Sequence, residues 1–146
     1  MDQTRIGDRE LVFGLLDAAA VLERHLDTVL SNIKGISFSE YRLLAALERE
    51  HDSTATRVGL AGAVGLTPSG VTRALRPLEK LGFVETIRDA RDARRSLATL
   101  AEGGVELVSD AHGVVNDTIA QFSALDSVND GDRALVAQLV TQLARG

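Results

Sequence analysis

One short stretch carries most of the structural information in this chain: Gly65-Leu66-Thr67-Pro68-Ser69-Gly70-Val71-Thr72-Arg73-Ala74-Leu75. Thr67 is a good N-cap, and Pro68 fits the first position of a helix, where its missing N–H costs no hydrogen bond. In the helix that follows, Val71, Leu75 and Leu78 share one face, and polar and cationic residues share the opposite face. The stretch therefore predicts an amphipathic helix with a cationic outer face.

A shorter helix is expected immediately before this one, over residues 56–64, with its apolar residues facing inward. Gly65 closes this first helix, and Gly82 ends the second one with apolar Phe83 just beyond it. Two helices joined by a tight turn, the second with a cationic outer face, are typical of a helix-turn-helix.

The hydrophobic period changes from 3.6 to 2 after Gly82, which is typical of strands. Two alternating runs, residues 83–87 and 96–100, flank an arginine-rich loop at residues 88–95. We expect these runs to pair as a β-hairpin. A hairpin placed directly after a helix-turn-helix is a wing.

Helical periodicity also dominates the N-terminal part of the chain. Between residues 8 and 33, apolar residues recur at spacings of 4, 3, 4, 4, 3 and 4. These residues are Leu11, Leu15, Ala18, Leu22, Leu26, Val29 and Ile33. Lys34 and Gly35 end this helix. Ser37 with Glu40 forms a capping box that begins the next one.

Two further helices are expected at the C-terminal end, before and after a break at residues 124–126. The first carries a heptad seam and the second an apolar stripe. Their residues are Val105, Val108, His112, Val115, Ile119 and Phe122, and then Leu135, Val136, Leu139, Val140 and Leu143. The chain offers no second core for these stripes to cover. We therefore expect a second copy of the chain to bury them in a homodimer.

These elements together predict a mainly α fold with a small β-hairpin wing, a winged helix-turn-helix with N- and C-terminal dimerisation helices. Residues 1–36 are expected to form the N-terminal dimerisation helix, residues 37–101 the winged helix-turn-helix lobe, and residues 102–146 the C-terminal dimerisation helices. The three segments are expected to build one intertwined domain.

The composition is that of a globular chain of 146 residues, with 45% hydrophobic and 25% charged residues. No apolar run approaches the ~18 residues of a membrane span, and residues 1–10 lack the basic, then apolar, pattern of a signal peptide. We expect a soluble, cytoplasmic protein. The absence of cysteine excludes disulfides, thiolate zinc sites and cysteine-based catalysis.

Other catalytic signatures are missing from the sequence as well. It contains no Gly-x-x-x-x-Gly-Lys phosphate loop, no Gly-x-Ser-x-Gly elbow and no His-Glu-x-x-His metal motif. The three histidines are scattered, without a carboxylate pattern that would make a metal site. We expect a chain that is not an enzyme and that holds no cofactor or metal.

Positive charge is concentrated in the middle of the chain. The net charge is −5, but residues 57–95 contain eight cations and four anions, a local charge of +4 that leaves −9 on the flanks. A basic centre with acidic flanks indicates a DNA-binding protein whose remaining mass faces away from the duplex. The alternative is an ordinary solvated charged surface.

Two motifs give residues 11–143 a resemblance to the MarR family of bacterial transcription regulators. The wing sequence Asp89-Ala90-Arg91-Asp92-Ala93-Arg94, followed by Leu100, Gly103 and Gly104, is similar to the family's Asp-x-Arg-Asp-x-Arg…Leu-Thr-x-x-Gly pattern. Residues 66–73 are similar to the start of the family's recognition helix. Two positions depart from the pattern. Ala101 replaces the usual Thr cap at a cost of ~1 kcal/mol, and Pro77 is expected to kink or soften the end of the recognition helix.

The helix that starts at Pro68 is then expected to enter the major groove of DNA. Arg73 is the best candidate to read a guanine, because its fork matches O6 and N7 together. Arg76, Lys80 and Thr67 are expected to hold phosphates. The full set of candidates on this helix is Thr67, Pro68, Ser69, Gly70, Thr72, Arg73, Arg76 and Lys80.

The wing supplies a second set of candidates. Arg91, Arg94 and Arg95 are expected to reach the adjacent minor groove, where a narrow groove concentrates negative potential. The resemblance implies that Asp92 orients Arg94 through an ion pair. The alternatives to these DNA contacts are an exposed polar helix face and a solvated loop with local salt bridges.

The resemblance also implies a homodimer on a palindromic operator, with half-sites about 34 Å apart, and repression by occlusion. It implies release by a small effector, often aromatic or phenolic. His25, Tyr41, Arg42 and His112 are the candidate polar groups for such a site, although a histidine on an apolar face is more often a core residue than a ligand. The alternatives are a protein-interaction adaptor, which would expose apolar residues on the recognition helix, and a DNA-binding regulator with no ligand response.

Overall fold

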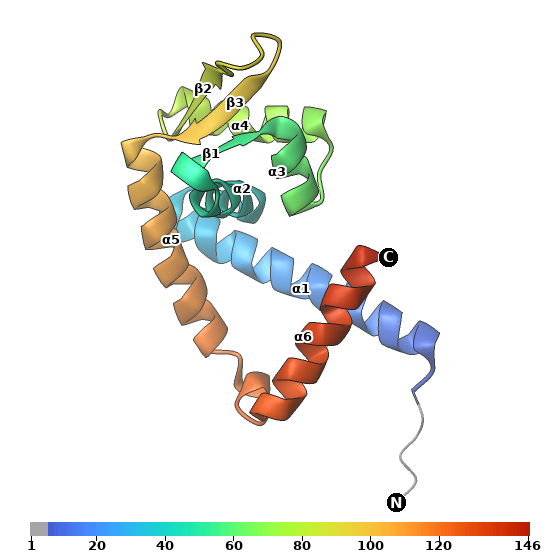
Figure 1. Cartoon of the computed structure of the whole chain (residues 1–146). Helices are drawn as coiled ribbons and strands as arrows, with labels where there is room; N and C mark the ends of the chain where they lie inside the picture. Colours follow the sequence, from blue (N-terminus) through green and yellow to red (C-terminus); the bar gives the residue numbers. More distant parts are fainter. Residues whose placement is uncertain (1–5) are drawn as a thin grey trace, which may run out of the picture. The chain divides into compact units, whose positions relative to one another are not determined.

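The computed structural model describes residues 6–146, so residues 1–5 of the predicted N-terminal segment lie outside the described residues. Over this range the elements are α1 (Asp8–Lys34), α2 (Phe38–Arg49), η1 (His51–Ser53), β1 (Thr54–Thr56), α3 (Arg57–Val64), α4 (Pro68–Lys80), β2 (Val84–Arg88), β3 (Ser96–Leu100), α5 (Glu102–Ala120), η2 (Ser123–Leu125) and α6 (Asp130–Arg145). The chain divides into two compact units, Met1–Val115 and Asn116–Gly146. The prediction of a mainly α fold with a small wing is confirmed (Figure 1).

The helix boundaries follow the capping residues that the sequence indicates. Gly35 ends α1 in the left-handed conformation, with φ at 70°. The capping box of α2 is complete: the Glu40 backbone N–H donates to Ser37 Oγ at 3.0 Å, and the Ser37 N–H donates to Glu40 Oε2 at 3.0 Å. Local hydrogen bonding therefore fixes where α1 ends and α2 begins.

The sheet has one strand more than the predicted hairpin. Its order is β1-β3-β2, and both pairs are antiparallel. The hairpin of β2 and β3 is the wing. β1 pairs with the edge of β3 that faces away from β2, and Thr54 lies opposite Thr99. The sequence does not predict β1, because a run of three residues is too short to show a period of 2.

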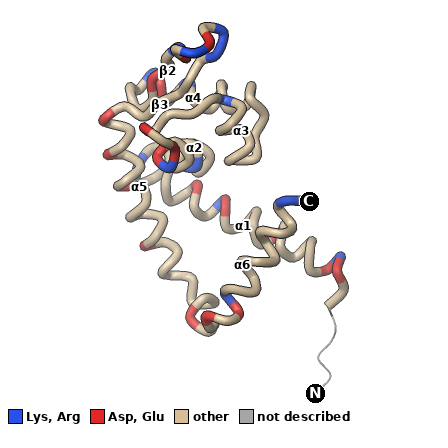
Figure 2. Tube along the Cα trace, viewed as in Figure 1, with Lys and Arg blue, Asp and Glu red and all other residues tan. Residues whose placement is uncertain are grey.

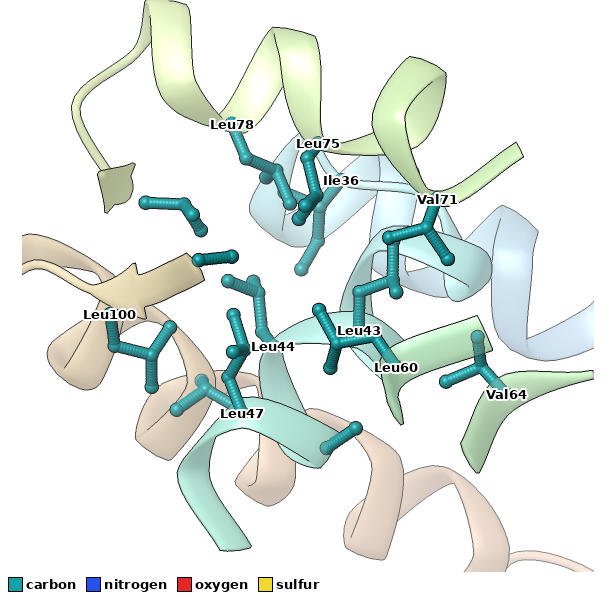
Figure 3. Packing of buried hydrophobic residues seen from close by; sticks show 14 of the residues in the cluster. Ile36, Leu43, Leu44, Leu47, Leu60, Val64, Val71, Leu75, Leu78 and Leu100 are labelled. Atoms are coloured by element: carbon teal, nitrogen blue, oxygen red, sulfur yellow. The ribbon is translucent and has the colours of Figure 1, made fainter. Parts of the chain in front are cut away.

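The core of the larger unit is built around α2, which contacts α1, α3, α4 and the sheet. Leu43, Leu44 and Leu47 of α2 are fully buried. Figure 3 shows Leu75 and Leu78 of α4 pointing toward this group from the other side. Truncating such a leucine to alanine typically costs about 2–5 kcal/mol, so α2 anchors the lobe.

Several predicted apolar stripes stay largely uncovered within the chain. In α5, Val108 and Val115 are buried, whereas Val105 and Ile119 of the same predicted seam are exposed. The exposed large apolar residues of α1 and α6 are Leu11, Val12, Phe13, Leu16, Val21, Leu22 and Ile33, and then Leu135, Val136, Val140 and Leu143. In the described part of the chain, no helix combines the length and apolar character needed to cross a membrane.

The start of α5 is packed tightly against the start of the wing. The Ala101 backbone N–H donates to the Phe83 carbonyl oxygen at 3.0 Å, which joins the two segments where a Thr cap is missing. A Cβ on Gly104 would lie 2.0 Å from that same carbonyl oxygen. A Cβ on Gly103 would instead make an ordinary contact, 3.6 Å from the Phe83 ring. Gly104 is therefore the glycine that the packing requires.

We expect Gly104→Ala to lower the free energy of unfolding by about 3 kcal/mol, because backbone must move to admit the methyl group. The matched control Gly103→Ala should leave the stability unchanged or raise it by up to ~1 kcal/mol, through the better helix propensity of alanine. Urea unfolding followed by circular dichroism measures both. Equal stability of the two variants would contradict the packing of α5 on the wing.

Candidate nucleic-acid interface

The recognition helix α4 has one buried face and one exposed face, as its sequence predicts. Val71 and Leu75 are fully buried, and they turn the opposite face to solvent. On that outer face Ser69, Arg73, Arg76 and Lys80 are exposed. The outer face is therefore polar and cationic, which is the surface that a DNA-reading helix needs.

The beginning of α4 is organised by its N-cap. Thr67 Oγ1 accepts a hydrogen bond from the Gly70 backbone N–H at 3.1 Å and lies 3.2 Å from Ser69 Oγ. Pro68 occupies the first turn. A Cβ on Gly70 would press against Thr67 Oγ1 at 3.1 Å, so glycine here protects the cap. The exposed, positive end of the helix dipole is thus held in a form that attracts phosphate.

Thr72 differs from the other candidates on this helix, because its hydroxyl is used inside the protein. Thr72 Oγ1 donates to the Pro68 carbonyl at 3.1 Å and accepts from Arg57 Nε at 3.1 Å. The side chain is half-buried. The helical period puts Thr72 on the cationic face, but in the structure its polar atom faces Arg57.

The end of α4 follows the predicted glycine stop. The helix runs unbroken through Pro77 to Lys80. The Phe83 N–H donates to the Leu78 carbonyl at 2.9 Å and the Gly82 N–H to the Glu79 carbonyl at 3.0 Å, with Gly82 at φ +79°. This pair of bonds is a Schellman motif, which suits glycine because of the positive φ. Any softening by Pro77 stays a prediction.

The wing loop presents arginines on a backbone that is tied down by its own aspartates. Arg91, Arg94 and Arg95 are all exposed, and Figure 2 shows the cationic segments gathered along this loop. Asp89 Oδ1 accepts from the Arg91 N–H at 2.9 Å, and the Asp89 N–H donates to the Arg95 carbonyl at 3.0 Å. These bonds fix the backbone and leave the guanidinium groups in solvent.

One prediction about the wing is wrong. Asp92 was expected to orient Arg94 through an ion pair, but Asp92 Oδ1 accepts from the Arg94 backbone N–H at 3.0 Å. No ion pair joins the two side chains in the described part of the protein. A carboxylate two residues before an N–H closes a local turn more readily than it reaches a mobile guanidinium. Asp92 therefore shapes the loop.

One of the cations counted in residues 57–95 does not contribute to the exposed charge of the interface. Arg57 forms an ion pair with Glu79 at 3.2 Å, so these two charges compensate each other. Removing this pair from the eight cations and four anions of residues 57–95 leaves seven against three, still +4. The remaining positive charge belongs to the exposed face of α4 and to the wing.

Comparisons with protein families and with solved structures agree with the helix-turn-helix and wing described above. Residues 34–95, which include α2, the helix-turn-helix and most of the wing, match the sequence model of the MarR family. Over these residues the chain is similar to the MarR family. Sco3205 from Streptomyces coelicolor, a MarR family regulator solved in complex with DNA, has a TM-score of 0.86 and 25% identity, over 96% of this chain and 89% of that one.

Two further solved structures share the MarR fold. A mutant of MarR from E. coli, complexed with operator DNA, has a TM-score of 0.78 and 21% identity, over 91% of this chain and 92% of that one. CouR from Rhodococcus jostii, bound to p-coumaroyl-CoA, has a TM-score of 0.82 and 20% identity, over 97% and 96%. No curated protein sequence matches the chain. The chain thus has the fold of these solved regulators.

The four residues proposed for a MarR effector site do not form one cluster. Tyr41 Oη lies 2.8 Å from His112 Nδ1, and His112 Nε2 lies 2.6 Å from Glu48 Oε2. A histidine protonated at Nε2 satisfies both contacts, because it accepts from the tyrosine and donates to the carboxylate. Arg42 instead lies over the Phe38 ring, 6.0 Å from its centroid. His25 is exposed on α1.

Arg42 borders a separate hollow between α1 and α2. The hollow has a volume of about 240 Å³ and is lined by Glu23, Arg24, Asp27, Phe38, Ser39 and Arg42. Asp27 Oδ1 also accepts from the Phe38 backbone N–H at 2.8 Å, which holds the start of α2 on α1. The lining combines an aromatic ring, a hydroxyl and two arginines with two carboxylates.

Two residues of functional interest are not singled out by any motif in the sequence. Glu48 completes the Tyr41–His112 contact, and Arg57 was counted only as one more cation. A weak signal exists for Glu48, since it follows Tyr41 by seven residues and so shares its helix face. For Arg57 the sequence holds no comparable signal, because its partners lie on three other elements, α4, β2 and β3.

The surroundings of Tyr41 predict how the stability of the protein changes at alkaline pH. Burial raises the pKa of the Tyr41 phenol above its ordinary value of 10.0, Glu48 raises it further and Arg49 lowers it. A group whose pKa is raised by folding stabilises the fold below its unfolded pKa, and this contribution is lost as the pH rises through the folded pKa. We therefore expect stability to fall above about pH 10.

Ultraviolet absorbance measures this titration cleanly, because Tyr41 is the only tyrosine and the chain has no tryptophan. The phenol should titrate later in the folded protein than in urea. Glu48→Gln should reduce the difference without removing it, because burial is the larger cause. Identical titrations in the folded and unfolded protein would contradict the partly buried Tyr41–His112 contact.

Proposed function

We propose that this chain is a transcription regulator of the MarR type, a homodimeric repressor that binds a palindromic operator and blocks transcription by occlusion. The observation that carries the proposal is the exposed cationic face of α4 beside three exposed wing arginines. Since residues 57–95 keep a charge of +4 in a chain of net charge −5, the rest of the molecule is repelled from a duplex. DNA is therefore favoured to meet this surface alone.

The contacts divide into those that read bases and those that hold phosphates. Arg73 lies one turn into α4 and is exposed, so it is the proposed guanine reader. Arg76 and Lys80 follow along the same helix and are proposed to hold phosphates. The wing arginines are proposed to enter the minor groove. Thr72 is left out of base reading, because its hydroxyl is bonded to Arg57 and Pro68.

The homodimer is supported by the apolar surface on the terminal helices. Leu22 and Ile33 of α1 are 43% and 60% exposed, and Leu135 and Leu143 of α6 are 66% and 50% exposed. So many exposed apolar side chains on one monomer indicate an interaction surface. A two-fold dimer would place two copies of α4 about 34 Å apart, one helical turn of DNA.

A small effector is the proposed signal for release. The hollow beside Arg42 supports this, since the Phe38 ring can stack on an aromatic compound and Ser39 and Arg42 can bind its oxygens. The hollow lies between α1, a proposed dimer helix, and α2, which carries the recognition lobe. An occupant there would change the angle between them. The adaptor alternative is disfavoured by the polar outer face of α4.

Selection of duplexes from a random pool tests the proposed function. We expect an enriched palindrome with half-sites one helical turn apart, and an affinity that falls steeply with salt. The slope of log affinity against log salt should be about −0.9 for each phosphate held. Enrichment of a non-palindromic site would contradict the dimer, and no enrichment with weak, salt-independent binding would contradict DNA binding itself.

Two variants separate the roles of helix and wing on the selected duplex. Arg73→Ala should cost about 1–3 kcal/mol of binding free energy and relax the preference at one base pair. Arg94→Ala should weaken binding without changing the preference at that base pair. Fluorescence anisotropy with a library of single-base variants measures both. Unchanged affinity of Arg94→Ala at physiological salt would show that the wing does not touch DNA.

A further inference from the structure

Arg57 lies between the recognition helix and the wing, and its side chain is mostly inside the protein. The side chain is 17% exposed, and that of its ion-pair partner Glu79 is 28% exposed. Arg57 is the first residue of α3 and directly follows β1, whose last residue pairs with Leu97 of β3. The backbone on which the guanidinium is mounted is therefore fixed by the sheet.

The guanidinium donates hydrogen bonds to three different elements. On α4 it bonds Thr72 through Nε at 3.1 Å and Glu79 through Nη2 at 3.2 Å. On β2 it bonds Thr86 Oγ1 through Nη2 at 3.2 Å, and on β3 it bonds Ser96 Oγ through Nη1 at 3.2 Å. A planar fork with donors in fixed directions is the group that can hold four such partners at once.

The partners of Arg57 are also tied to one another. The Thr86 hydroxyl donates to Glu79 Oε1, which joins β2 to α4 directly. Thr72 and Glu79 lie seven residues apart, so the contacts grip α4 over about 10 Å of its length. The recognition helix is held at two points rather than one, and this fixes its direction relative to the wing.

The sheet register explains why a polar connection is needed at this place. Val84 and Ala98 are buried and belong to the face of the hairpin that packs on the core. The register pairs Thr86 with Ala98 and Arg88 with Ser96, so Thr86 and Ser96 continue that face toward the tip of the wing. Hydrophobic packing therefore holds the part of the wing next to the core, and the Arg57 hydrogen bonds hold the part beyond it.

We infer that Arg57 is a positioning residue for DNA recognition, which sets the spacing and angle between α4 and the wing without touching DNA. This inference rests on the proposed function. A helix and a wing add their binding free energies only if both reach their grooves without strain. Loss of the Arg57 contacts therefore lowers affinity for the selected operator, whereas non-specific binding depends on surface charge and stays unchanged.

The variant Arg57→Lys tests this most sharply, because it keeps the charge and loses the fork. We expect its affinity for the selected palindrome to fall about ten-fold, a size typical of one lost specific contact. Its affinity for an unrelated duplex and its salt slope should match the wild type. A lysine that replaced a phosphate-binding arginine would keep much of its function, since an ammonium also binds phosphate.

Arg76 provides the matched control, since it is exposed on the same helix and proposed to hold a phosphate. Arg76→Ala should weaken binding to both duplexes and make the salt slope shallower by about 0.9, and Arg76→Lys should restore most of the loss. If Arg57→Lys behaves like wild type, or if Arg57→Ala lowers the salt slope as Arg76→Ala does, Arg57 is not a positioning residue.

A second measurement follows the wing itself and needs no DNA. Thr86→Val removes one partner of Arg57 on the exposed part of β2, so it is the milder variant. Arg57→Lys and Thr86→Val should each speed tryptic cleavage in the arginine-rich loop 88–95, and the double variant should add little because the two residues act in one network. Unchanged cleavage in both single variants would overturn the inference.

The two proposals fail in different ways. If the wild type enriches no duplex, the proposed function fails, and with it the role of Arg57 in DNA recognition. If the wild type binds a palindrome and Arg57→Lys binds it equally well, only the inference about Arg57 fails. Thermal melting of each variant gives the folded fraction, and affinities are compared for the folded protein.

Discussion

The packing of α4 on α2 is the constraint on which the rest of the structure depends. Val71, Leu75 and Leu78 are buried against the leucines of α2, and each such side chain contributes about 1.5–3 kcal/mol when it leaves water. Because these residues lie on one side of the helix, their burial forces the cationic side outward. The same burial decides where the DNA-facing groups lie before any DNA is present.

Hydrophobic packing fixes the helix on the core, but it does not extend to the tip of the wing. Polar contacts take over there: Arg57 links the helix to both strands, and the aspartates of the loop close its backbone. Polar groups of this kind cost little near the surface and are directional. The interface thus combines an apolar base, packed on the core, with an upper part that hydrogen bonds hold in place.

Much of this arrangement could be predicted from the sequence, because it depends on near neighbours. Thr67, Ser37 with Glu40, and Gly82 act within a few residues of themselves, and the structure confirms each of them. The identity of the recognition helix follows from its 3.6-residue period. The fold class and the cationic surface could both be predicted in this way.

The features that the sequence did not indicate depend on distant partners. β1 exists because it pairs with β3, and a run of three residues carries no pattern of its own. The helical period places Thr72 on the same face as Arg73. In the structure, Arg57 of α3 donates a hydrogen bond to the Thr72 hydroxyl. His112 meets Glu48 across 64 positions of the chain. Asp92 could bind either the side chain or the backbone N–H of Arg94, and the conformation of the folded loop decides that it accepts from the N–H.

Hydroxyl-radical footprinting of a duplex enriched by the protein is the most direct test of the central claim that α4 and the wing read DNA together as a symmetric pair. We expect protection on both strands, related by two-fold symmetry, with two major-groove segments one helical turn apart and a minor-groove segment outside each. A single asymmetric footprint, or uniform protection that ignores sequence, would contradict the claim.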